Sequence, residues 1–135
     1  MDRLRALERW LADRFRDKDF SLAPASADAS FRRYFRVAFA SGEPRTLIAM
    51  DAPPEREDCR PFVHVAGLLE RAGLQAPRVL AQDLAQGFLL LTDLGTTTYL
   101  AALEHDRSLA DRLFADATDA LGKWQLASRR AELPA

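Results

Sequence analysis

Two short alternating segments joined by a tight turn constrain the fold of this chain more than any other feature. Residues 31–39 place apolar side chains mainly at odd positions, which is the period-two pattern of a half-buried strand. Residues 41–44, Ser-Gly-Glu-Pro, are typical of a turn, and residues 45–51 then predict a second strand. The sequence therefore predicts an antiparallel hairpin.

The segments around this hairpin alternate between helical and strand patterns. Residues 24–30, Pro-Ala-Ser-Ala-Asp-Ala-Ser, are small and polar and predict a loop. The other expected elements are an amphipathic helix ending near 17–19, a strand at 20–23, a helix from the cap Asp58 to 72, strands at 78–84 and 88–92, and helices at 99–104 and 108–128. We therefore predict an α+β fold, with a five-stranded antiparallel sheet, a packed helix and flanking helices at both ends.

Composition and charge narrow the classes of partner. The 135 residues are 48% apolar, enough for one core, and the formal net charge of −1 gives no field that attracts nucleic acid or a membrane surface. No apolar run approaches the roughly 20 residues of a membrane span, and the charged first residues do not resemble a signal peptide. Cys59 is the only cysteine, so we expect no internal disulfide and a cytoplasmic location.

Several segments resemble a known superfamily. Residues 28–37, Asp-Ala-Ser-Phe-Arg-Arg-Tyr-Phe-Arg-Val, resemble the phosphate loop and following strand of aminoglycoside phosphotransferases and choline-kinase-like enzymes. Residues 47–55, 57–62 and 87–95 are similar to one branch, the anomeric kinases for N-acetylmuramate and N-acetylglucosamine in peptidoglycan recycling. This resemblance implies a protein-kinase-like amino-terminal lobe with its hinge at residues 1–97, and a helical segment at 98–135 leading into a carboxy-terminal lobe.

The resemblance also implies a nucleotide site with three parts, a phosphate loop, a strand position and a hinge. Successive backbone amides in a tight loop bind anions, and arginine suits phosphate because its fork forms paired hydrogen bonds. Between Arg32 and Arg33 we favour Arg33 as the phosphate ligand, because the alternation of side chains along the strand places it on the same side as Phe35. The ordinary alternatives are a plain hairpin loop, a solvated arginine face and a simple strand exit. The candidate nucleotide-binding residues are Asp28, Ala29, Ser30, Arg32, Arg33, Met50, Leu91, Thr92, Asp93 and Leu94.

Two departures from the kinase pattern limit what this chain can do. Met50 stands where kinases carry the strand lysine that holds the phosphates, so the usual ion pair between that lysine and a helix glutamate, here Glu70, cannot form. The superfamily's catalytic loop and metal-binding aspartate lie in the carboxy-terminal lobe, and we interpret Asp93-Leu94-Gly95 as hinge. His64 and His105 lack metal-ligand spacing. We expect no catalytic or metal-binding residue in this chain.

The resulting hypothesis is a nucleotide-binding amino-terminal lobe of a sugar kinase. The full-length enzyme would transfer the γ-phosphate of ATP or GTP, with Mg²⁺, to a sugar hydroxyl, whereas the 135 residues alone are expected to be inactive. The alternative is a non-catalytic binding or interaction module with the same fold. In either case Leu113, Leu121 and Trp124 on the last helix are candidates for self-association.

Overall fold

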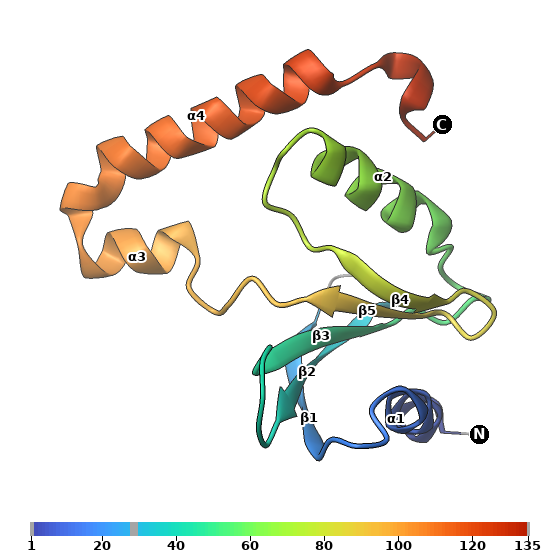
Figure 1. Ribbon diagram of the computed structural model, residues 1–135. Coiled ribbons are helices and arrows are strands. Elements are labelled where there is room, and N and C mark those ends of the chain that lie inside the picture. Colours follow the sequence, from blue (N-terminus) through green and yellow to red (C-terminus); the bar gives the residue numbers. More distant parts are fainter. Residues whose placement is uncertain (1, 28–29, 135) are drawn as a thin grey trace. The chain divides into compact units, whose positions relative to one another are not determined.

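The predicted α+β class is confirmed. The structure, a computed structural model, describes residues 2–27 and 30–134 (Figure 1). Its elements in chain order are α1 (Arg3–Arg14), β1 (Phe20–Ala27), β2 (Arg33–Phe39), β3 (Thr46–Asp51), α2 (Arg60–Arg71), β4 (Val79–Asp83), β5 (Phe88–Thr92), α3 (Tyr99–His105), the 3₁₀ turn η1 (Arg107–Leu109), α4 (Ala110–Ala127) and the 3₁₀ turn η2 (Arg130–Glu132).

All five strands form one antiparallel sheet in the order β1-β2-β3-β5-β4. The chain leaves β3, passes through α2 to the edge strand β4, and returns by a tight turn so that β5 lies between β4 and β3. Cross-strand partners lie on the same face of a sheet, so the register separates two faces. We call them the α1 face, which carries Phe35, Val37, Ala49 and Leu90, and the Met50 face, which carries Tyr34, Ile48, Met50, Leu89 and Leu91.

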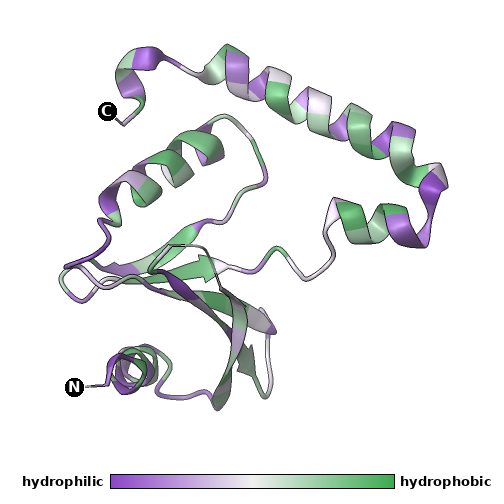
Figure 2. Ribbon diagram, turned by 180° about the vertical axis from the view of Figure 1, so that it is seen from behind, coloured by the Kyte–Doolittle hydropathy of each residue, from purple (hydrophilic) through white to green (hydrophobic). Residues whose placement is uncertain are grey.

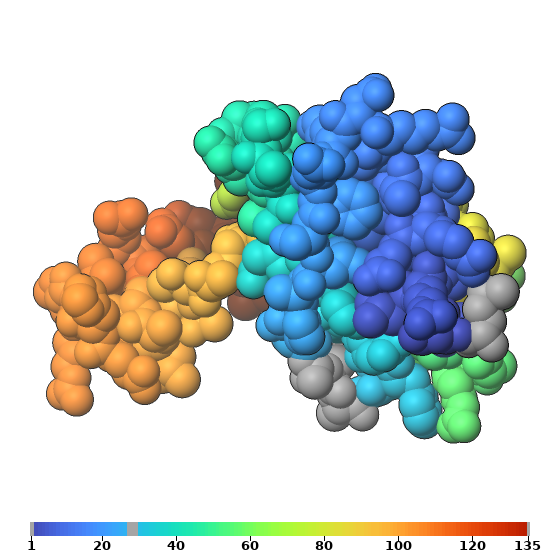
Figure 3. Space-filling model, turned by 90° about the horizontal axis from the view of Figure 1, so that it is seen from below, coloured from blue at the N-terminus to red at the C-terminus, as the bar shows by residue number. Residues whose placement is uncertain are grey.

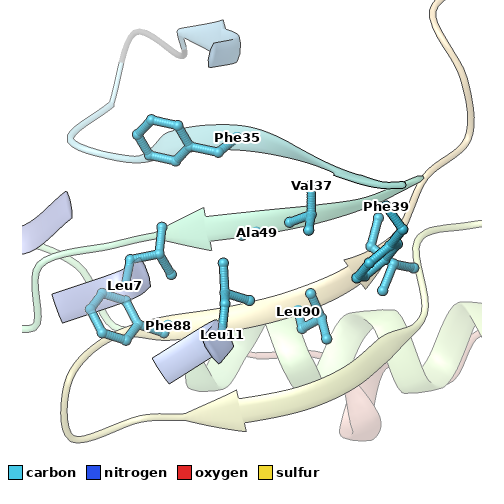
Figure 4. Packing of buried hydrophobic residues seen from close by; sticks show 9 residues of the cluster. Leu7, Leu11, Phe35, Val37, Phe39, Ala49, Phe88 and Leu90 are labelled. Atoms are coloured by element: carbon cyan, nitrogen blue, oxygen red, sulfur yellow. The ribbon is translucent and has the colours of Figure 1, made fainter. Parts of the chain in front are cut away.

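The α1 face forms the larger core. Leu7 and Leu11 of α1 are fully buried and pack against the apolar side chains that β2, β3 and β5 direct at the helix (Figure 4). The view from this side shows the atoms of α1 and β1 side by side (Figure 3). Asp2 caps the helix by accepting a hydrogen bond from the backbone N–H of Leu4 at 3.0 Å. The amphipathic opening helix thus covers one face of the sheet, although it ends at Arg14, before the predicted 17–19.

The Met50 face forms a second, smaller core. Met50, Leu89 and Leu91 pack with Ala52 and Cys59. Phe62 and Val63, at the start of α2, add to this cluster. Asp58 accepts a hydrogen bond from the backbone N–H of Arg60 at 3.0 Å, as the predicted cap should.

The loop before β2 is shorter than predicted. Residues 24–27, expected as loop, continue β1, and β2 begins at Arg33 rather than at residue 31. β1 is an edge strand, where proline is tolerated, and the register shifts between Pro24 and Ser26. The sequence signal of small residues and a proline was therefore compatible with an irregular edge strand as well as with a loop.

The chain divides into two compact units, which we describe separately. One comprises the chain up to Val63 together with Pro77–Asp93, and contains the whole sheet. The other comprises His64–Ala76 and the chain from Leu94 onward, and contains α3 and α4. Apolar and polar residues alternate along the turns of α4 (Figure 2). Within residues 2–27 and 30–134, no helix is both long and apolar enough to cross a membrane.

Candidate functional site

The phosphate-loop candidates fall at the boundary of the described chain. Asp28 and Ala29 lie outside the described residues, so the structure says nothing of them. Ser30 is exposed, and its hydroxyl accepts a hydrogen bond from the backbone N–H of Arg32 at 3.3 Å. The loop therefore enters β2 through a short hydrogen-bonded turn that orients Arg32.

Arg32 lies with the residues of the Met50 face. Its guanidinium stacks over the ring of Phe62 at 5.6 Å, and its Nε atom lies 3.4 Å from the Glu57 carboxylate. This Nε is buried and makes no hydrogen bond within the described chain. Burial lowers the pKa of Arg32, but the side chains of Tyr34 and Glu57 outweigh burial and raise the pKa above its usual value. Arg32 is therefore a fixed positive charge.

Arg33 lies on the opposite face of the sheet. It occupies the row of Phe35, as alternation predicted, but that row faces α1 rather than Met50. Its guanidinium donates to the fully buried carboxylate of Asp51 at 2.7 Å, and Arg3 of α1 donates to the same carboxylate at 2.8 Å through Nε. Two charge-assisted contacts thus satisfy a buried acid at the end of β3. The structure does not bring Arg33 and Met50 together.

Met50 is fully buried beneath the start of α2. It pairs with Tyr34 on β2 and with Leu89 on β5, and its neighbours in the cluster are apolar. A lysine ammonium in these surroundings would need a buried acidic partner to offset its desolvation. The apolar side chain at the usual lysine position therefore fits the surroundings that this chain provides.

The predicted hinge continues directly from β5. Leu91 is buried on the Met50 face, whereas Leu94 is exposed. The Thr92 backbone N–H donates to the Arg78 carbonyl at 3.1 Å, and its hydroxyl accepts from the Arg78 N–H at 2.9 Å. Because the Thr92 N–H is already used by Arg78, just before β4, any hinge amide offered to a base must come from the residues after Thr92.

A second arginine fixes the hinge aspartate. Arg36 on the Met50 face donates to the two carboxylate oxygens of Asp93, at 2.7 Å through Nε and at 3.3 Å through Nη2. Both side chains are largely buried, which strengthens a fork-to-carboxylate pair. The Arg36 guanidinium is therefore engaged by Asp93. The pair engages both carboxylate oxygens of Asp93.

Two residues that sequence reasoning did not select now belong to the candidate site. Ile48 is half-buried on the Met50 face, and its cross-strand partner is Leu91 of β5. The period-two pattern of β3 could have identified it, because Ile48 and Met50 are two residues apart. Glu57 pairs with Arg32, but it lies in a turn between elements, where no periodicity signals a contact.

Other candidate chemistry is weak in the described residues. No group of three or more His, Cys, Asp or Glu side chains there could hold a metal ion. Cys59 is buried, and burial raises the pKa of its thiol, which disfavours the reactive thiolate form. His64 contacts the backbone carbonyl of Glu132 through Nε2, which indicates a structural role.

Comparisons with known proteins decide the family. A sequence profile described as the phosphotransferase enzyme family matches residues 21–135. This chain belongs to the phosphotransferase enzyme family. Three relatives named N-acetylmuramate/N-acetylglucosamine kinase support the assignment. The relative from Pseudomonas aeruginosa is 58% identical over 84% of this chain, that from Pseudomonas putida 50% over 95%, and that from Neisseria meningitidis 38% over 99%.

The match covers only part of each kinase. This phosphotransferase-family chain spans 32% of the length of the Pseudomonas aeruginosa relative, 38% of the Pseudomonas putida relative and 40% of the Neisseria meningitidis relative. The family resemblance expected from residues 28–37 and 87–95 is confirmed.

Proposed function

We propose that this chain is the nucleotide-binding lobe of an amino-sugar kinase, with residues 1–97 as the lobe and hinge and residues 98–135 as the segment that leads onward. One observation carries the proposal. Arg32, the half-buried Ile48 and the hinge aspartate, held by Arg36, all belong to the Met50 face of the sheet. A nucleotide needs this combination, because it presents an apolar ring, a hinge-facing edge and a polyphosphate.

The adenine end of the proposed site lies at β3 and β5. Ile48 and Leu91 form a cross-strand apolar pair, and the buried Met50 lies two residues further along β3. The half-buried Ile48, backed by the buried Leu91 and Met50, would give apolar contact to a purine ring, while the backbone from Asp93 to Leu94 would meet the edge of the ring. The Arg36 ion pair fixes Asp93, the first residue of this backbone segment, to the sheet.

The phosphate end of the proposed site is the loop from Asp28 to Arg32. Backbone amides of the loop and the Arg32 guanidinium would receive the β- and γ-phosphates, because a positive charge must replace the absent strand lysine. We favour Arg32 over Arg33, since Arg33 is committed to Asp51 on the opposite face. Arg33 then serves the phosphate site only indirectly, by fixing the start of β2.

We assign no magnesium ligand to the described residues. They contain no cluster of three or more His, Cys, Asp or Glu side chains that could hold a metal ion, and Asp93 is paired with Arg36. Catalysis of phosphoryl transfer depends on positioning and charge neutralisation. This lobe would supply nucleotide positioning and one cation. Acceptor binding and proton removal from the sugar hydroxyl would require residues beyond this chain.

The activity is tested with the full-length gene product and with the 135-residue chain in parallel. We expect the full-length protein with Mg²⁺ and ATP to phosphorylate N-acetylmuramate or N-acetylglucosamine, as measured by the anomeric ³¹P signal of the product. We expect the 135-residue chain to give no product above a no-protein control. Failure of the full-length protein with both sugars and with GTP would contradict the kinase proposal, and activity of the short chain would contradict the assigned division of labour.

A specific observation favours the interaction module as a second candidate. Large apolar side chains are exposed on α3 and α4, namely Leu100, Phe114 and Leu121, at 67%, 66% and 55%. Trp124, in contrast, is half-buried and lines a small pocket with Leu68 of α2. If the exposed apolar side chains of α3 and α4 mediate self-association, sedimentation velocity should show dimers of the wild-type chain. The double variant Phe114→Glu/Leu121→Glu should then be monomeric. A wild-type chain that stays monomeric at high concentration would exclude this role for the surface.

A further inference from the structure

Kinase-like lobes hold their phosphate-binding lysine in place with a glutamate, and Met50 removes the lysine from that arrangement. An unpaired, mobile cation is a poor phosphate ligand, because each rotamer-rich side chain loses freedom when it is immobilised on binding. If Arg32 replaces the lysine, its side chain also needs a partner that fixes it before the nucleotide arrives.

The structure provides such a partner in Glu57. The Glu57 carboxylate lies 3.4 Å from Arg32 Nε, and both side chains are mostly buried, at 17% and 25% exposure. Phe62 supports one face of the guanidinium at 5.6 Å. The carboxylate contacts the guanidinium through Nε, and the guanidinium has two further nitrogens that can donate to a phosphate.

The turn that carries Glu57 is held by its own backbone hydrogen bonds. The backbone N–H groups of Arg56 and Glu57 donate to the Pro53 carbonyl at 2.9 and 2.8 Å. The guanidinium of Arg56 also lies 4.7 Å from the ring centre of Phe31, next to the phosphate loop. Two contacts thus connect this turn to the loop, one through Arg56 and the other through Glu57.

We propose that Glu57 is the positioning residue for phosphate recognition, and that the Glu57–Arg32 pair replaces the lysine–glutamate pair of other kinase-like lobes. This proposal rests on the proposed nucleotide-binding function. Glu57 does not touch the nucleotide. It acts through Arg32 by holding the guanidinium against Phe62 at the mouth of the loop.

The sign of the effect separates positioning from simple electrostatics. Glu57 is a negative charge near the proposed phosphates, so removing it without any other effect should strengthen triphosphate binding. If Glu57 positions Arg32, the same removal should weaken triphosphate binding, because Arg32 then has to be ordered on binding. Adenosine, which lacks phosphates, should be insensitive to the change in either case.

The test compares ATP and adenosine affinities of the chain by NMR titration. The variants are Glu57→Gln, Arg32→Ala and the double variant. Glu55→Gln is the matched control, because it removes an equal charge two residues away from an exposed position. Circular dichroism verifies folding, and Glu57→Ala, which also removes the charge, replaces Glu57→Gln if the amide variant does not fold.

We expect Arg32→Ala to weaken ATP binding about 10-fold or more, the loss of one charge-assisted hydrogen bond. Glu57→Gln should weaken ATP binding about 3- to 10-fold, leave adenosine binding within about twofold, and add no further loss in the Arg32→Ala background. Stronger or unchanged ATP binding in Glu57→Gln, or an equal loss in both backgrounds, would overturn the positioning role. If the wild-type chain binds ATP no better than adenosine, the proposed function fails as well.

Discussion

Replacing Gly87 with alanine would place a methyl group 1.9 Å from the backbone oxygen of Ala52, at the end of β3. Side-chain Cβ atoms essentially never approach closer than 3.0 Å, so the two backbones must separate by about 1.1 Å. This movement would break the hydrogen bond from the Ala52 N–H to the Gly87 carbonyl, now 2.8 Å long. Gly87 also has a φ of +77°, where a side chain is strained.

The magnitude follows from these terms. The left-handed φ costs about 1–2 kcal/mol, and the broken hydrogen bond at the buried Ala52 adds about 1–3 kcal/mol. Gly42 provides a matched control, because its φ is +85° but nothing lies within 4 Å of its added Cβ. We therefore expect Gly42→Ala to lower the free energy of unfolding only by the cost of the left-handed φ. Gly87→Ala should lower it by about 2 kcal/mol more.

Urea unfolding followed by circular dichroism measures both variants against the parent chain. The difference of about 2 kcal/mol should also lower the Tm of Gly87→Ala by about 6–10 °C relative to Gly42→Ala in a chain of this size. Equal losses for the two variants, within about 0.5 kcal/mol, would refute the claim that close packing of the β4–β5 turn fixes the end of β3.

Three further predictions concern charged residues. Asp51→Asn should lower the free energy of unfolding by about 2–4 kcal/mol in urea denaturation, because the buried negative charge is lost and the amide NH2 would face one of the two arginine donors; a loss below 1 kcal/mol would contradict this. Arg36→Gln should increase amide hydrogen exchange at Asp93 and in the hinge, while exchange in β2 stays unchanged; equal hinge protection in both proteins would contradict the fixed hinge. Hydrogen bonds from the Gln86 side chain and backbone lower the pKa of Asp83 in the folded state. The stability that Asp83 contributes is therefore complete above its unfolded-state pKa and is lost as the pH falls through the lower folded-state pKa. The free energy of unfolding should depend less on pH between 7 and 3 in Asp83→Asn than in the parent chain, and an unchanged pH dependence would contradict this role of Asp83.

Much of the fold could be predicted because local signals were unambiguous. The helical stripe around Leu7 and Leu11, the cap Asp58 and the alternation around Val37 each match one element of the structure. Residues 88–92 form β5 within the predicted limits. The boundaries of β1 were wrong because a proline on an edge strand has the same local signature as a proline in a loop.

The site could be predicted only in part, because alternation identifies rows of side chains but not which face each row covers. Arg33 and Phe35 do share a row, yet only the position of α1 shows that this row faces the first core. The partners Asp51 and Glu57 depend on contacts distant in sequence, 18 and 25 residues from their arginines, which no local pattern reveals. The family resemblance supplied the loop and hinge, and the structure separated Arg32 from Arg33.

The central claim is that a nucleotide binds to the Met50 face, and the Met50 methyl group tests it most directly. The chain contains two methionines, Met1 and Met50, so ¹³C-methyl labelling of methionine gives one signal from the core of the proposed site. We predict that ATP shifts the Met50 methyl resonance in a saturable way, through the ring current of adenine near Ile48 and Leu91. Inorganic triphosphate, which lacks the ring, should leave it nearly unchanged. A Met50 signal that does not respond to saturating ATP or GTP would contradict the account.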